Sequence, residues 1–129
     1  MTKSTIELVQ LTDSHLFGDP TRSLRGVATL PALRATLAAA QADLAACDAI
    51  LATGDLVQDD PGGYAHFRAE MGRLGRPVLC TPGNHDDVPA MYAALAQPPF
   101  QCGGTWDAGN WRVILLDSTI PGETAGRIA

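Results

Sequence analysis

The chain has 129 residues, of which 46% are hydrophobic and 18% charged, so its composition excludes intrinsic disorder and predicts a single folded domain over residues 1–129. Its formal net charge of −5 provides no basic surface for a nucleic-acid polymer or an anionic membrane, and no apolar stretch approaches the roughly 18 residues of a membrane span. Its three cysteines show no Cys-x-x-Cys spacing, which argues against a disulfide framework or a zinc knuckle and favours a cytoplasmic location.

Four short apolar segments have the length and the flanking Gly, Asp and Pro residues of buried strands. In chain order they are residues 6–11, the end of residues 44–53, residues 77–81 and residues 111–116. Continuous apolar character of this kind is typical of parallel strands, which are covered on both faces. We therefore expect four strands in one mostly parallel sheet.

Helical patterns separate these strands. Leucines at helical spacing predict a helix from residue 30 to residue 44, with Thr29 as its N-cap and Pro31 in its first turn. A second helix is expected to start at Asp60 and to end near Gly75. A third, over residues 88–96, has Asp86 or Asp87 as its cap. Alternating strands and helices predict an α/β fold with helices on the faces of the sheet. Residues 16–26 are expected to form a loop above the first strand.

A small polar cluster follows each predicted strand. The clusters are residues 12–15, 54–55, 83–86 and 117–118, which contain Asp13, His15, Asp55, Asn84 and His85. The carboxyl ends of parallel strands lie side by side, so these clusters are expected to meet in one crevice. Oxygen and imidazole donors without thiolates are typical ligands of Mn, Fe or Zn. The pattern thus predicts a metal site, in which we expect Asp117 to be a supporting residue.

Each cluster alone has an ordinary structural explanation. An Asp-x-His triplet occurs often by chance, Gly54-Asp55 is also a common turn, and residues 83–86 could be a loop that caps the next helix. His66 lies beside the apolar stripe of the second helix and is expected to face solvent. The conjunction of three clusters in order, each at a strand end, favours the functional explanation.

Asp13-Ser14-His15, Gly54-Asp55 and Gly83-Asn84-His85-Asp86 resemble the motifs of the calcineurin-like metallophosphoesterases. This resemblance implies an αββα sandwich, with a mostly parallel sheet and flanking helices, that binds two divalent metal ions and hydrolyses phosphate esters. Similarity to the bacterial 3',5'-cyclic-AMP phosphodiesterase subgroup is found in residues 10–17, 54–59, 115–118, 121–123 and 126–127. The implied substrate is a small phosphodiester, with cyclic AMP as the expected one.

Carried over to this sequence, the resemblance implies that Asp13 and His15 bind one metal, Asp55 bridges both, and Asn84 binds the other. His85 would face the substrate, as a general acid or by neutralising phosphoryl charge. Asp86 would either orient the His85 imidazole or cap the following helix. Water held between two metals about 3.5–4 Å apart loses a proton near neutral pH and can attack phosphorus. Fe or Mn is expected, with Zn as an alternative.

The family also has an isolated His and a later Gly-His-x-His motif, whereas the histidines here are His15, His66 and His85. The resemblance therefore covers the N-terminal portion of a domain truncated at its C-terminus relative to the family, and we expect ligands for one metal of the two. Two hypotheses follow. The first is a phosphodiesterase completed by a missing C-terminal half or by a homo-oligomeric partner. The alternative is a catalytically incomplete remnant that binds a metal or phosphate.

Overall fold

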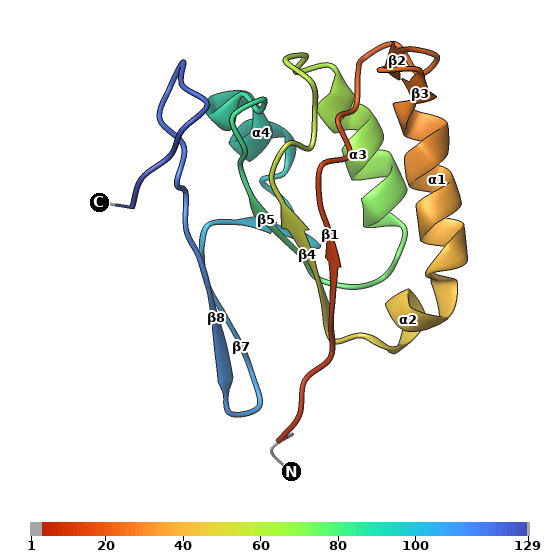
Figure 1. The fold of residues 1–129 in the computed structure, drawn as a ribbon. Helices are drawn as coiled ribbons and strands as arrows, with labels where there is room; N and C mark the ends of the chain where they lie inside the picture. The colour runs from red at the N-terminus through yellow and green to blue at the C-terminus, as the bar shows by residue number, and fades with distance from the viewer. Residues whose placement is uncertain (1–3, 129) are drawn as a thin grey trace.

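A computed structural model describes residues 4–128, and a four-stranded parallel sheet lies at its centre (Figure 1). The spatial order is β1 (Leu8–Leu11), β4 (Ala49–Thr53), β5 (Val78–Thr81) and β6 (Phe100–Cys102). All three strand pairs are parallel, so the four carboxyl ends lie at one edge of the sheet. The expected α/β class with a parallel sheet and flanking helices is confirmed.

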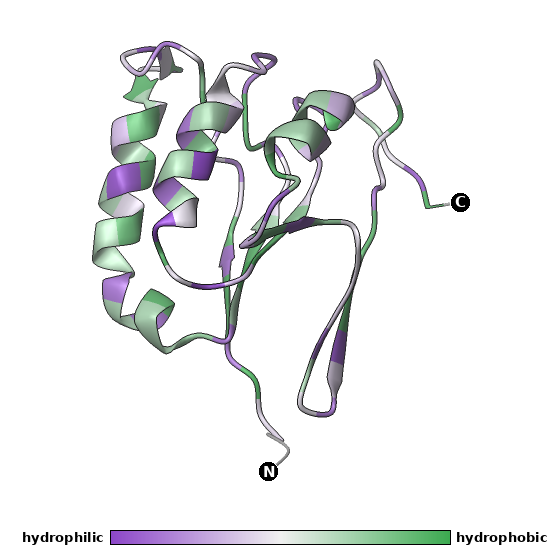
Figure 2. Cartoon of the chain, turned by 180° about the vertical axis from the view of Figure 1, so that it is seen from behind, coloured by the Kyte–Doolittle hydropathy of each residue, from purple (hydrophilic) through white to green (hydrophobic). Residues whose placement is uncertain are grey.

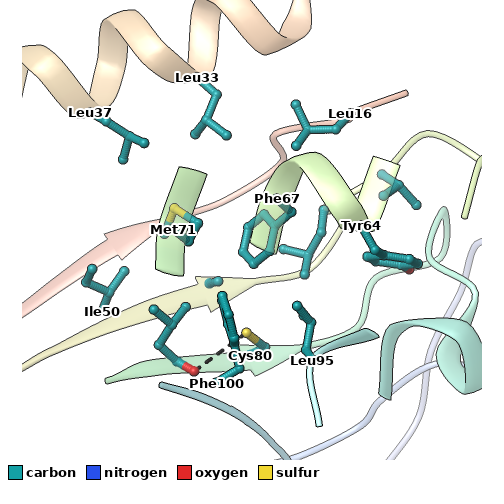
Figure 3. Close-up of a cluster of buried hydrophobic side chains, with 14 of the residues drawn as sticks. Leu16, Leu33, Leu37, Ile50, Tyr64, Phe67, Met71, Cys80, Leu95 and Phe100 are labelled. Carbon is teal, nitrogen blue, oxygen red and sulfur yellow. Dashed lines mark hydrogen bonds between the residues drawn. The ribbon is translucent and has the colours of Figure 1, made fainter. Parts of the chain in front are cut away.

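The helices lie on one side of this sheet: α1 (Thr29–Ala39), α2 (Gln41–Ala46), α3 (Gly63–Gly72) and α4 (Val88–Ala94). Hydrophobic and hydrophilic segments alternate along α1 and α3, as Figure 2 shows. The apolar residues Leu33, Leu37, Phe67 and Met71 meet Ile50 in a buried cluster (Figure 3). Each such side chain stabilises the fold by about 1.5–3 kcal/mol when fully buried. This core packs the helices against the sheet whose edge carries the loops described below.

The prediction for residues 111–116 was wrong about the sheet. β8 (Trp111–Leu115) pairs antiparallel with β7 (Gly104–Ala108), and this hairpin packs on the other face of the central sheet through Leu115, which joins Ala49 and Leu79 in a second cluster. The fourth parallel strand is instead β6. It has only three residues, too few for a recognisable hydrophobic pattern. Within residues 4–128, the helices therefore cover only one face.

Several predicted boundaries also differ from the structure. Thr29 is the first helical residue rather than the N-cap, and the helix breaks at Ala40 between α1 and α2. The segment expected as a loop contains β2 (Ser23–Leu24), which pairs with β3 (Val27–Ala28). Helix α3 begins three residues after Asp60. Among the described residues, no helix has the length and apolarity needed to cross a membrane.

Candidate metal centre

The loops after β1 and β4 are joined by backbone hydrogen bonds. The N–H groups of Asp13 and His15 donate to the carbonyl oxygens of Gly54 and Asp55 over 3.1 and 2.9 Å. Asp13, His15 and Asp55 have positive φ angles of 60°, 47° and 50°, a conformation that is uncommon outside glycine. The two loops thus continue side by side beyond the sheet and turn their polar side chains toward one another.

Asp13, His15 and Asp55 form a group that could hold a metal ion. One ligand atom from each lies within 4.8 Å of the others. His15 Nε2 is 3.3 Å from Asp13 Oδ1 and 4.0 Å from Asp55 Oδ2. Two carboxylates and an imidazole suit Mn, Fe or Zn, so the donor chemistry fits the ion that the sequence predicts. The structure therefore brings together three of the four predicted metal ligands.

The loop after β5 closes against Asp55. The backbone N–H of His85 donates to Asp55 Oδ1 over 3.0 Å. Gly83 is required for this approach, because a β-carbon at that position would collide with the Asp55 carboxylate and backbone nitrogen. Asn84 is exposed and lines, together with Asp13 and Asp55, a cavity of about 290 Å³. The fourth predicted ligand thus lies on the same cavity as the metal-ligand group.

The imidazole of His85 is held by a carboxylate. Its Nδ1 atom lies 3.0 and 3.1 Å from the two carboxylate oxygens of Asp59. Because a carboxylate accepts only, Nδ1–H donates to Asp59 and Nε2 is the nitrogen left for chemistry. The His15 and His85 ring centres are 5.8 Å apart, which places His85 beside the metal-ligand group.

Asp86 has neither of the roles expected for it. Its carboxylate accepts hydrogen bonds from the backbone N–H groups of Leu56, Val57 and Gly83 and from the Tyr64 hydroxyl. The helix cap is Asp87, whose side chain accepts from Ala90 N–H. Asp86 therefore fastens the loop after β5 to the loop after β4. Burial and the adjacent Asp86 carboxylate raise the pKa of Tyr64 well above its usual value.

The remaining polar candidates have local structural roles. Asp117 Oδ1 accepts from the N–H and hydroxyl of Thr119, which agrees with its predicted supporting role. Contrary to expectation, His66 does not simply face solvent, since its Nε2 lies 2.8 Å from the Gly18 carbonyl and donates to it. Sequence reasoning missed Gln58 and Asp59, although both lie within the motif that follows Asp55.

Comparison with known proteins agrees with this geometry. The family model described as calcineurin-like phosphoesterase matches residues 6–122, and the chain belongs to this family. It is 40% identical over 98% of its length to the 3',5'-cyclic adenosine monophosphate phosphodiesterase CpdA of Haemophilus influenzae, of which it covers 47%.

The protein of the same name from Escherichia coli K12 is 35% identical over 98% of the chain, with 47% of that relative covered. The Pseudomonas aeruginosa protein of this name is 38% identical over 97% of the chain, with 46% of that relative covered. The chain thus spans about half the length of these curated relatives.

Proposed function

We propose that the chain takes part in metal-dependent hydrolysis of a small phosphodiester, a 3',5'-cyclic nucleotide and specifically cyclic AMP. The observation that carries the proposal is the convergence of Asp13, His15 and Asp55 beside His85 at the carboxyl edge of a parallel sheet. Family membership supports the reaction class. The names of the relatives support the substrate, which comes to this chain only by similarity.

In this proposal, Asp13 and His15 would hold one divalent ion, the side-chain oxygen of Asn84 would hold a second, and Asp55 would be a ligand of both. Fe or Mn is the proposed metal, with Zn as the alternative. When bound, such ions polarise a phosphoryl oxygen and lower the pKa of water. The His85 N–H holds the Asp55 carboxylate in place and Gly83 leaves room for it, so the second oxygen, Oδ2, lies on the side of His15.

His85 donates a proton from Nε2 to the leaving oxygen of the substrate or neutralises charge on the phosphoryl group. Asp59 keeps the ring in one orientation, with Nδ1 on the side of the carboxylate and Nε2 free to face the substrate. Asp86 acts only through the loops that it connects. We therefore assign to Asp86 a positioning role in place of a catalytic one.

Asp13, His15 and Asp55 are the only group of three or more acidic, His or Cys side chains with this geometry among residues 4–128. Asp55 and Asn84 alone give the second ion few ligands. We propose that further ligands come from a polypeptide segment outside the printed sequence or from a second copy of the chain. The three cysteines are free, which supports a cytoplasmic site of action.

The test is a comparison of two proteins with Mn²⁺. The first is the 129-residue chain, and the second is a chimera that continues into the C-terminal half of the Haemophilus influenzae relative. Hydrolysis of cyclic AMP and of bis(p-nitrophenyl) phosphate is measured for both. We expect slow turnover by the short chain and a large increase in the chimera. Asp55→Asn should abolish the increase, whereas Asp43→Asn on α2, far from the sheet edge, should not.

A folded, metal-loaded chimera that hydrolyses neither substrate would contradict the proposal and favour the alternative of a metal- or phosphate-binding module. If the short chain is itself fully active, a second copy completes the site. Its specific activity should then fall on dilution as that assembly dissociates.

A further inference from the structure

We propose that Gln58 is a positioning residue that selects the tautomer of His15 and so turns the lone pair of His15 Nε2 toward the metal-ligand group. The inference rests on the proposed function only in that a cation is taken to bind beside Asp13 and Asp55. It assigns a role to a side chain for which sequence analysis found none.

The amide of Gln58 lies between the two imidazoles of the site. Its Oε1 atom is 2.7 Å from His15 Nδ1. On the other side, its Nε2 atom is 3.2 Å from Asp59 Oδ2 and 3.3 Å from His85 Nδ1. One side chain therefore contacts both histidines and the carboxylate that orients His85.

The orientation of this amide follows from its neighbour. The Asp59 carboxylate can only accept hydrogen bonds, so the NH₂ group of Gln58 must face it. His85 Nδ1–H donates to the same carboxylate, so the 3.3 Å approach of Gln58 Nε2 to His85 Nδ1 joins two donors and is not a hydrogen bond. The carbonyl oxygen of Gln58 then faces His15 and can only accept. Hence His15 Nδ1 must carry a proton. In the neutral ring, Nε2 is then unprotonated and directed at Asp13 and Asp55.

Without Gln58, the opposite tautomer is favoured in the metal-free protein. His15 Nε2 lies 3.3 Å from Asp13 Oδ1, so a proton on Nε2 could be donated to that carboxylate. Such a proton would occupy the lone pair that a metal needs. Gln58 opposes this arrangement because its carbonyl would then face an unprotonated Nδ1, which leaves two acceptors in contact.

The backbone fixes the position of Gln58. Its N–H donates to the Leu16 carbonyl over 3.0 Å, and the N–H of Asp59 donates to the His85 carbonyl over 3.1 Å. Adjacent residues on one loop are thus fastened to the loops that carry His15 and His85. Gln58 orients His15 and Asp59 orients His85, so the loop after β4 sets both rings together.

The experiment measures the tautomer directly, by long-range ¹H–¹⁵N correlation spectra of the metal-free 129-residue chain at a pH where the His15 signals show a neutral ring. We expect the proton on Nδ1 in the wild type. In Gln58→Leu, the population with the proton on Nε2 should become the larger one. Gln58→Glu combined with Asp59→Asn keeps an acceptor for Nδ1–H without setting two carboxylates against each other, and should restore the wild-type pattern. Gln41→Leu, on the distant helix α2, is the matched control and should change nothing.

A second readout is the affinity for Zn²⁺, measured by calorimetry. Loss of a partner that orients a ligating histidine lowers affinity by about 10- to 100-fold, and we expect Gln58→Leu to fall in this range. Gln58→Glu combined with Asp59→Asn should remain closer to the wild type than Gln58→Leu.

A wild-type His15 with its proton on Nε2 overturns the proposal, whether or not any variant folds. Unchanged tautomer and Zn²⁺ affinity in a folded Gln58→Leu protein overturn it as well. Neither measurement involves phosphodiester hydrolysis, so failure of the proposed reaction is distinguishable from failure of this inference.

Discussion

The backbone N–H of His85 and the side chain of Asp55 join neighbouring strand ends through one hydrogen bond of 3.0 Å. This contact uses Asp55 Oδ1, while Oδ2 faces His15. The carboxylate therefore belongs both to the fold and to the candidate metal centre. Changes that move the loop after β5 should consequently alter metal binding without touching a ligand.

Gly83→Ala provides the first test of this coupling. The added methyl group would overlap the Asp55 carboxylate, and relief of such a collision typically costs about 1–3 kcal/mol. Because relief of the collision displaces the Asp55 carboxylate from its position beside His15, we expect Mn²⁺ affinity to drop, by about tenfold where about 1.4 kcal/mol of the metal interaction is lost. Calorimetric titration measures the loss. Gly72→Ala on α3 is the control, because its methyl group would make ordinary contacts of 3.7 Å with Phe100.

The loss of Mn²⁺ affinity on removal of a ligand should depend on the charge of that ligand. Asp55→Ala deletes a bridging anion and should weaken Mn²⁺ binding more than Asn84→Ala, which deletes a neutral oxygen donor. With only the ligands that this chain supplies, it should bind one ion more tightly than a second. Calorimetry gives both the affinity and the stoichiometry. Equal losses in the two variants would show that Asp55 does not bridge.

Asp86→Ala should destabilise the fold much more than Asp87→Ala. The Asp86 carboxylate accepts four hydrogen bonds, and bonds to charged groups are worth about 1.5–3 kcal/mol each, so we expect a loss of at least about 3 kcal/mol. Asp87 supplies a single N-cap bond, worth about 1 kcal/mol. Urea unfolding measures both. Similar losses would mean that Asp86 is no more than a loop residue.

The stability of the chain should decline at alkaline pH because of Tyr64. Burial and Asp86 raise the pKa of Tyr64 in the folded chain, so its contribution to stability is fully present below about pH 10, where the unfolded tyrosine ionises. As pH rises further, this contribution is lost. Urea midpoints measured across this range should fall with pH. Tyr64→Phe should start from a lower midpoint but show a shallower decline.

His85→Ala in the chimera should lower turnover by roughly 10² to 10⁴ while metal content stays nearly the same, as expected for a proton donor. Asp59→Asn should lower turnover less, because it leaves the imidazole in place but removes the charge that orients it. Turnover and metal content by mass spectrometry are measured together. Loss of metal from the His85 variant would identify His85 as a ligand instead.

The proximity of Asp13, His15 and Asp55 was predicted correctly. The apolar segments in the sequence identify the buried strands, and the carboxyl ends of parallel strands lie at one edge of a sheet. The same reasoning failed for residues 111–116. An apolar run shows that a strand is partly buried but does not specify the partner strand. Here the turn after β7 pairs β8 with β7 instead of with β6.

Side-chain partners within the site were less predictable than its location. Adjacent positions suggested that Asp86 orients His85, yet the turn directs Asp86 toward the amides of Leu56 and Val57. Asp59, 26 positions from His85, contacts the ring instead. The direction of these side chains depends on loop backbone angles. Asp59 itself has a positive φ of 53°, which the neighbouring residue types do not predict.

The backbone of the site has a consequence for protein engineering. Four of the five non-glycine residues with positive φ among residues 4–128 are Asp13, His15, Asp55 and Asp59. Each such conformation costs about 1–3 kcal/mol. Selection for thermal stability alone would therefore favour glycine or asparagine at these positions and would remove the carboxylates and imidazole that define the site. A more heat-resistant version of this chain should be sought in its helices and hairpin, with these four residues held fixed.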